Sequence, residues 1–188
     1  MGSSSISSST IAKSTITWPS VVSSNASTGT IKYATEHPIT FITFNSSNYD
    51  WYYTEDSSTD NTRWITSSSA KSIYDPCPAG WSVPDNDVWS DALGSSLTFT
   101  NESLYSSTNK GMNFSGNFGA DATIWYSLSG YRGYNDGALR SVRYGGNYWS
   151  ASPYDNNAYS LYLSNTSSTN PLNFGHRSIS YSVRCIQE

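Results

Sequence analysis

The sequence has few of the side chains that carry catalytic or metal chemistry. Its 188 residues include only 2 His and 2 Cys, and charged residues make up 13% of the chain. General acid–base catalysis relies on His, carboxylate or Lys groups. The sequence also lacks a His-Glu-x-x-His run, a glycine-rich phosphate loop and a nucleophile elbow. We therefore expect that the protein is not an enzyme and that it needs no cofactor.

Basic residues and long apolar runs are also scarce. The chain has 10 Lys and Arg against 14 Asp and Glu, a formal net charge of -4. A nucleic-acid surface needs clustered Lys and Arg to neutralise phosphates, and a membrane-spanning helix needs about 20 consecutive apolar residues. Neither pattern occurs in the sequence. We expect no nucleic-acid partner and no membrane insertion.

Aromatic and uncharged polar residues are abundant instead. The 7 Trp, 15 Tyr and 6 Phe are far more than a disordered chain carries, so the chain should fold. Ser, Thr and Asn together account for about 73 residues, roughly 39% of the chain. A surface of hydroxyls, amides and phenols indicates recognition rather than catalysis.

The length favours one folded domain. A core of this size can bury roughly 70% of the surface of the unfolded chain without a second unit. Residues 1–14 are rich in Ser and lack the basic start and apolar core of a signal peptide, which predicts a flexible leader. We expect a single domain over residues 15–188.

The two cysteines are separated by 108 residues (185 − 77). Cys77 precedes the strand-like segment 81–84, and Cys185 ends the alternating run 179–184. A disulfide between them would fix a terminal strand to an early one, and the composition is typical of secreted proteins. The alternative is a pair of buried free thiols in a reducing compartment. The spacing matches no metal site, and we expect none.

Apolar spacing predicts two short helices. The first lies within residues 27–36, with Ser27 or Thr28 as its cap. The second begins after Asp85 or Asn86. Its apolar face comprises Val88, Trp89, Ala92 and Leu93.

Runs of β-branched and aromatic residues predict strands in both halves of the chain. They lie at 15–22, 39–44, 48–54, 130–132, 145–152, 158–163 and 180–185. In the segment 158–163 the residues alternate, which predicts one buried and one outward face. The buried face comprises Tyr159, Leu161 and Leu163. The outward face comprises Ser160, Tyr162 and Ser164. We also expect Tyr148 and Trp149 in the core.

Three ordered motifs carry a resemblance to a known family. Residues 74–84, 146–152 and 182–185 resemble the Fibrobacter succinogenes major paralogous domain family, which is common in Bacteroidetes surface proteins. The resemblance covers most of residues 28–188. It implies a single α+β domain of the C-type-lectin-like kind, similar to formylglycine-generating enzymes. Such a domain has short helices, a mixed and mainly antiparallel sheet, and N- and C-terminal strands that lie together.

The last third also resembles the variable region of a protein targeted by a diversity-generating retroelement. In such proteins, mutagenesis at template adenines randomises selected codons, and the outcomes favour Asn, Tyr, Ser, Asp, His, Ile and Gly. That mixture occurs between framework-like pieces at 140–145, 154–157, 160–165 and 173–181. Antibody paratopes use a similar mixture, because Tyr provides contact area at low entropic cost while Ser, Gly and Asn adapt. The resemblance implies a variable ligand-binding region at 131–181.

The expected function is a receptor-recognition or adhesion module whose site is formed by these strands and loops. The partner would be a protein or glycan on another cell or particle, and the location the bacterial cell surface or a phage particle. The candidate ligand-binding residues are Tyr134, Arg140, Arg143, Tyr144, Tyr154, Asp155, Asn156, Ser160, Tyr162, Asn165, Asn173, Phe174, His176 and Tyr181.

Other functions remain open at this point. One is a structural or adhesive subunit of a surface appendage without a diversified site. A second is a formylglycine-generating type of oxidase, whose chemistry requires a reactive cysteine pair. A third is calcium-dependent sugar binding. Asp136 and Asp155 could bind a hard cation, but isolated Asp residues in Gly- and Asn-rich loops are more typical of turns.

Overall fold

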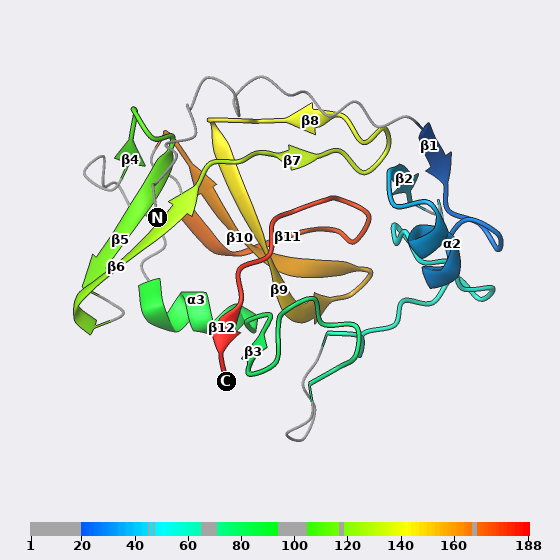
Figure 1. The fold of residues 1–188 in the computed structure, drawn as a ribbon, viewed down its shortest axis with the longest axis horizontal. Coiled ribbons are helices and arrows are strands. Elements are labelled where there is room, and N and C mark those ends of the chain that lie inside the picture. Colours follow the sequence, from blue (N-terminus) through cyan, green and yellow to red (C-terminus); the bar gives the residue numbers. More distant parts are fainter. Residues whose placement is uncertain are drawn as a thin grey trace, which may run out of the picture.

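The fold is mixed and consists mostly of β-sheet, with short helices, as expected for an α+β chain (Figure 1). The computed structural model describes residues 20–44, 46, 48–64, 71–93, 105–116, 119–166 and 169–188. The leader expected at 1–14 lies outside the described residues. No helix among the described residues is long and apolar enough to cross a membrane.

The centre of the molecule is an antiparallel sheet of three strands, ordered β11-β10-β9. The strands are β9 (Gly145–Tyr154), β10 (Asn157–Ser164) and β11 (Thr169–His176). A two-residue turn joins β9 to β10, and its first residue, Asp155, has a φ of 48°. Left-handed turn residues match the twist of a two-residue hairpin, and Asp tolerates that conformation. The sequence prediction covered β9 and β10 but not β11.

The central strand β10 is buried on both faces, which corrects the expected outward face. Leu161 and Leu163 are fully buried as predicted, but Ser160 also has 0% exposure and Ser164 is buried. The strand lies between β9 and β11, and the segment carrying Tyr181 crosses the Ser160 side of the sheet. Alternation alone cannot distinguish a solvent-facing Ser from one that faces a second covering layer.

A second antiparallel sheet completes the main core. It comprises β4 (Tyr105–Ser106), β5 (Gly111–Gly116) and β6 (Gly119–Ser127), in the order β4-β5-β6. Helix α3 (Asn86–Leu93) lies below both sheets in Figure 1 and inserts Trp89 between them. The shared core consists of Trp89, Met112, Phe114, Tyr126, Leu128, Tyr148, Leu161 and Leu163. Helix α3 starts where the sequence predicted, and Tyr148 and Trp149 are buried as expected.

The N-terminal part forms a separate small layer at the right of Figure 1. Strands β1 (Ser20–Ser23) and β2 (Thr40–Thr43) pair in parallel, and helix α2 (Ile31–Glu36) connects them. The cap of α2 is Thr30, whose side chain accepts a hydrogen bond from the Tyr33 N–H at 3.0 Å. The predicted caps, Ser27 and Thr28, were therefore wrong by two to three positions.

The C-terminal strand pairs with a strand from the middle of the sequence. Strand β12 (Ile186–Gln187) pairs with β3 (Trp81–Ser82), and a disulfide joins Cys77 to Cys185 next to this pair, with a Cα–Cα distance of 5.8 Å. The disulfide expected from the sequence is thus present. The described part of the chain does not place β1 beside β12, because β1 pairs with β2.

One further hairpin lies along the top of Figure 1. It consists of β7 (Tyr131–Arg132) and β8 (Leu139–Arg140). The predicted strand at 180–185 is present only as single bridges, from Ser180 to Arg132 and from Ser182 to Tyr148. The first bridge holds the last segment against β7, and the second holds it against β9 of the central sheet.

Candidate functional site

The structure divides the candidate ligand-binding residues between two ends of the central sheet. Strand β9 alone has 10 residues, so its ends are about 30 Å apart. The hairpin end, at the β9–β10 turn, carries Tyr134, Tyr154, Asp155, Asn156, Phe174 and His176. The loop end, at the start of β9, carries Arg140, Arg143, Tyr144, Tyr162 and Asn165. The residues expected to form one surface therefore form two.

Three candidates lie between these ends and are not freely displayed. Ser160 is fully buried, and its hydroxyl accepts a hydrogen bond from the Asn173 side chain at 3.2 Å. Tyr181 lies against Trp149, with ring centroids 4.3 Å apart, and against Tyr131 at 5.7 Å. These side chains contribute to the packing of the sheet, because they face the covering segment rather than solvent. Placing Ser160 on the ligand-facing surface was wrong.

The packing of Tyr181 yields a titration that can be measured. Burial raises the pKa of its phenol from 10.0 to about 12, and Tyr131 and Tyr162 add to the rise. The tyrosinate absorbance of the wild-type protein and of a Tyr181→Phe variant can be compared as the pH is raised. We expect the difference between the two titration curves, which reports Tyr181, to have its midpoint near pH 12. A difference curve with its midpoint near pH 10 would show that the Tyr181 ring is freely solvated.

The loop end displays its side chains most openly. Tyr144 is 66% exposed, and Arg140, Arg143 and Val142 are also exposed. The backbone is left-handed at Ser141, with a φ of 54°, and at Arg143, with a φ of 71°. Asn, Asp and Gly adopt this conformation more readily than Ser or Arg. Local backbone preference therefore does not explain the residues found there.

The hairpin end is built on an aromatic stack. His176 lies 4.2 Å from Tyr49 and 4.9 Å from Tyr134, measured between ring centroids, and Phe44 contacts both tyrosines. The Nδ1 atom of His176 is 3.0 Å from the Asn157 amide oxygen. Burial lowers the pKa of His176 below its usual 6.5, so the ring is neutral at pH 7. The sequence prediction missed the contribution of Phe44 and Tyr49.

A second aromatic group extends the same end. Phe174 is 51% exposed and lies 4.6 Å from Tyr154, which in turn lies 5.0 Å from Tyr159. Rings at these separations support one another and lose little side-chain entropy on binding a partner.

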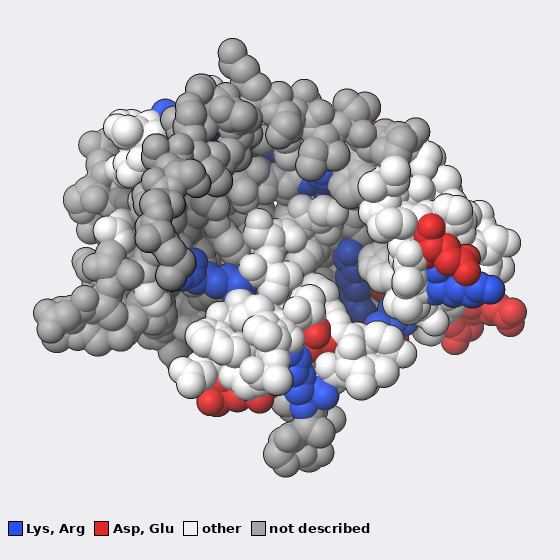
Figure 2. Space-filling view, in the orientation of Figure 1, with Lys and Arg blue, Asp and Glu red and all other residues white. Residues whose placement is uncertain are grey.

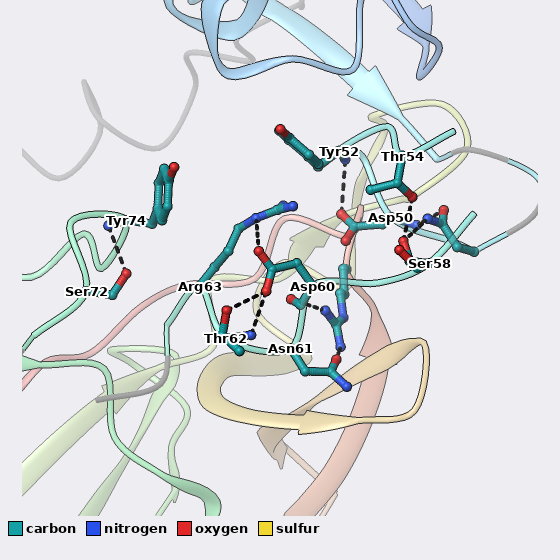
Figure 3. Close-up of polar contacts among 12 residues, drawn as sticks. Asp50, Tyr52, Thr54, Ser58, Asp60, Asn61, Thr62, Arg63, Ser72 and Tyr74 are labelled. Atoms are coloured by element: carbon teal, nitrogen blue, oxygen red, sulfur yellow. Dashed lines mark hydrogen bonds and ion pairs between the residues drawn. The ribbon is translucent and has the colours of Figure 1, made fainter. Parts of the chain in front are cut away.

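Arg177 connects the hairpin end to the loop that carries Asp60 and Asn61, and these two residues are labelled in Figure 3. Its guanidinium donates to the backbone oxygens of Asn157 and Asp155, both at 3.1 Å, and to that of Asp60 at 2.9 Å. It also donates to the side-chain oxygen of Asn61. One half-buried cation therefore fixes a loop more than 100 residues away in the sequence against the β9–β10 turn.

This connection closes one side of a cleft that the sequence analysis did not identify. The cleft has a volume of about 260 Å³ and lies between residues 50–64 and the hairpin end of the sheet. Its aromatic lining comprises Trp51, Trp64, Tyr74 and Trp149, and its polar lining includes Asp50, Asp60, Asn61, Arg63 and Arg177. Segment 48–54 forms this lining through turns instead of the predicted strand.

Hydrogen bonds from Asn48 and Asp50 produce those turns. The side chain of Asn48 accepts from the Asp50 N–H at 3.1 Å, and Oδ1 of Asp50 accepts from the Tyr52 N–H at 3.0 Å. An Asx side chain that bonds the backbone two residues on replaces a strand by a turn. The Asn-x-Asp spacing was the sequence signal that could have revealed this.

Metal-binding clusters do not occur in the part of the chain that is described. No three His, Cys, Asp or Glu residues within it are placed to hold a metal ion. Asp136 accepts from Arg140 at 2.8 Å and from the Ala138 N–H at 3.0 Å, as a turn residue does. Both cysteines are joined in the disulfide.

Comparisons with known proteins do not assign the chain to a family. No protein-family model matches it, and no curated protein or solved structure is a significant match.

Proposed function

We propose that the protein is a ligand-recognition module that displays a diversified surface on a C-type-lectin-like scaffold. Its ligand would be a protein or glycan on another cell or particle, and it would act at a bacterial surface or on a phage particle. One observation carries the proposal: within residues 131–181, exposed large side chains such as Tyr144 and Phe174 project from a firmly packed sheet. Recognition sites typically combine variable loops with such a rigid support.

The scaffold part of the proposal is supported by the composition of the fold. Short helices and mainly antiparallel sheets agree with the resemblance, whereas the C-terminal strand β12 pairs with β3 rather than with the N-terminal strand that the resemblance implies. The surface is also suited to recognition without strong charge. Figure 2 shows that most of the described surface on this face is uncharged, with acidic and basic residues scattered over it.

Diversification is supported by the residues at the loop end. Ser141 and Arg143 occupy a backbone conformation that Asn adopts more easily. A position that started as Asn and was randomised would show this mismatch between residue and backbone, although Tyr49, Ser57 and Lys110, outside residues 131–181, also have a positive φ. Selection for local stability alone would favour Asn or Gly there.

Sequencing independent isolates tests diversification. We expect substitutions to concentrate at exposed positions such as Arg143, Tyr144, Tyr154 and Phe174 and to spare Tyr148. The neighbouring DNA should contain a reverse transcriptase and a near-identical template repeat. Substitutions scattered over all loops, with no such repeat, would instead support a non-diversified structural or adhesive subunit.

Recognition can be tested on the same positions without knowing the natural ligand. A displayed library randomised at Arg143, Tyr144, Tyr154 and Phe174 should remain folded and yield binders to lysozyme. The control library randomises four exposed residues outside the region, namely Val21, Ile39, Ile73 and Trp81. We expect at least tenfold tighter selected clones from the first library. Equal performance of the two libraries would contradict a dedicated recognition surface.

The oxidase alternative receives no support from the cysteines. Its chemistry requires a reactive thiol pair, whereas Cys77 and Cys185 are bonded to each other beside the β3–β12 pair and Cys77 is buried.

A further inference from the structure

The cleft between residues 50–64 and the hairpin end has a composition that points to a ligand of its own. Its walls include three Trp side chains and Tyr74, which is 49% exposed at the rim. Figure 3 shows Arg63 between Tyr74 and Asp60, with Asp50 farther from Tyr74. Aromatic lining with a few fixed polar groups is typical of small-molecule sites.

The described residues that line the cleft include equal numbers of acidic and basic side chains. Asp50 and Asp60 oppose Arg63 and Arg177. Nε of Arg63 is 3.3 Å from an Asp60 carboxylate oxygen, and its guanidinium lies 3.6 Å from the centre of the Tyr52 ring. Both arginines therefore already have partners, since Arg177 donates to four oxygens. An anionic ligand would have to displace these contacts.

Asp50 is the polar group best placed for a ligand. It is only 3% exposed, yet it lines the cleft. Backbone N–H groups approach its carboxylate, and among the described residues no side chain donates a hydrogen bond to it. A carboxylate accepts several hydrogen bonds, so Asp50 retains capacity for donors from a ligand. A cationic ligand is disfavoured because Arg63 and Arg177 act on the same carboxylate.

A ligand that fits must therefore be uncharged, have an apolar face for the aromatic walls and carry several hydroxyl donors. A pyranose ring has these properties, because its C–H groups form apolar faces and its hydroxyls lie around the edge. The cleft volume of about 260 Å³ suits one such ring better than a whole oligomer. We propose that this cleft binds one residue of a neutral saccharide, with Trp64 and Tyr74 against its faces and Asp50 and Asn61 on its hydroxyls.

The residues proposed to contact the saccharide, in segment 50–64 and Tyr74, lie outside residues 131–181, while the opposite wall of the cleft, which includes Trp149 and Arg177, lies within that region. The proposed contacts form a framework site that would remain the same while the exposed surface varied. Failure of one proposal therefore leaves the other standing.

Asp50 also gives the site a testable signature in stability. Desolvation raises the pKa of Asp50 above 3.8, and the Tyr52 N–H and the two arginines only partly oppose this. The folded state then binds a proton more tightly than the unfolded state. The contribution of Asp50 to the free energy of unfolding therefore falls as the pH rises from its unfolded-state pKa through its raised folded-state pKa. In its ionised form the group therefore weakens the fold, as functional residues often do.

The test uses the intact protein and calorimetric titration with cellotetraose, xylotetraose, mannotetraose and chitotetraose. We expect at least one of them to bind with a Kd of about 1 mM or tighter. Tyr74→Ala should weaken that binding at least tenfold. The neighbouring Ile73→Ala is the matched control, because Ile73 is 90% exposed and outside the cleft. Asp50→Asn should weaken binding while raising the melting temperature by about 2 °C at pH 7.

Three results would overturn the proposal. The first is no binding of any neutral probe at about 10 mM. The second is preferential binding of sialyllactose or oligogalacturonate, which would show an anion site. The third is binding that Tyr74→Ala and Ile73→Ala leave equally unchanged. Melting curves of all variants show whether each remains folded.

Discussion

Removing the disulfide between Cys77 and Cys185 is expected to lower the free energy of unfolding by about 4 kcal/mol. The bond closes a loop of 108 residues, which contains α3 and every strand from β3 to β11. In the unfolded chain this closure removes a large number of extended conformations, and that constraint grows with the length of the loop.

The non-covalent contacts at this junction are too few to replace the bond. Strands β3 and β12 have two residues each, so their pairing contributes only two register positions. Asp75 helps to form the turn on the Cys77 side, where it accepts hydrogen bonds from the N–H groups of Cys77 and Val83. On the opposite side, one further backbone hydrogen bond extends the pairing, from the Glu188 N–H to the Gly80 oxygen at 3.1 Å. We expect β12 to fray when the bond is absent.

Urea unfolding of a Cys77→Ser, Cys185→Ser double variant measures the effect. Its m-value should also increase, because an unfolded chain without the cross-link exposes more surface. A reducing agent should weaken the wild-type protein by the same amount and leave the double variant unchanged. A loss below about 1 kcal/mol would mean that the folded contacts alone hold the C-terminus.

The parts of this fold that local sequence determines were the parts that could be predicted. Helix α3 has an apolar face with Trp89 and begins immediately after Asp85. Strand β9 combines aromatic framework residues with small neighbours, and the turn at 75–80 is marked by prolines and glycine. Each of these signals depends on residues within one turn or one strand.

The parts that depend on distant contacts could not be predicted in this way. Strands β5 and β6 contribute to the core that contains Trp89 of α3. The polar and Gly-containing sequence of β5 carries a weak strand signal, whereas the β-branched and aromatic run 123–126 in β6 is a local signal that the sequence prediction missed. The cleft depends on Arg177 reaching Asp60 across 117 positions of sequence. Nothing near either residue in the sequence predicts that contact.

The candidate binding residues show the same division. Tyr144 and Phe174 were expected on the surface and are exposed. Ser160 was expected beside them, but β10 became the central strand and a later segment covered its second face. Ser is small enough to be buried and polar enough to be exposed, so its presence in a strand does not predict its burial. A Tyr in a turn-rich loop is a clearer signal of an exposed side chain.

The burial of Ser160 predicts a second large effect on stability. Replacing Ser160 by Tyr is expected to lower the free energy of unfolding by about 3 kcal/mol or more. The position has no exposed surface, and its neighbours across the sheet are Trp149 on β9 and Asn173 on β11. A phenol ring would have to displace the covering segment at Tyr181, whose ring already lies on Trp149. The bond from the Asn173 side chain to the Ser160 hydroxyl would also be lost.

Replacing Tyr144 by Ser is the matched control, because it exchanges the same two residue types at an exposed position. It should change stability by no more than about 0.5 kcal/mol. Thermal melts and soluble yields of the two variants give the comparison. A Ser160→Tyr variant that melts like the wild-type protein would show that the covering segment yields easily. In that case position 160 could vary as freely as position 144, and the recognition surface would extend across the middle of the sheet. If instead only Ser160→Tyr unfolds the protein, any diversity at this sheet is confined to its two ends, because the packing between them admits no larger side chain.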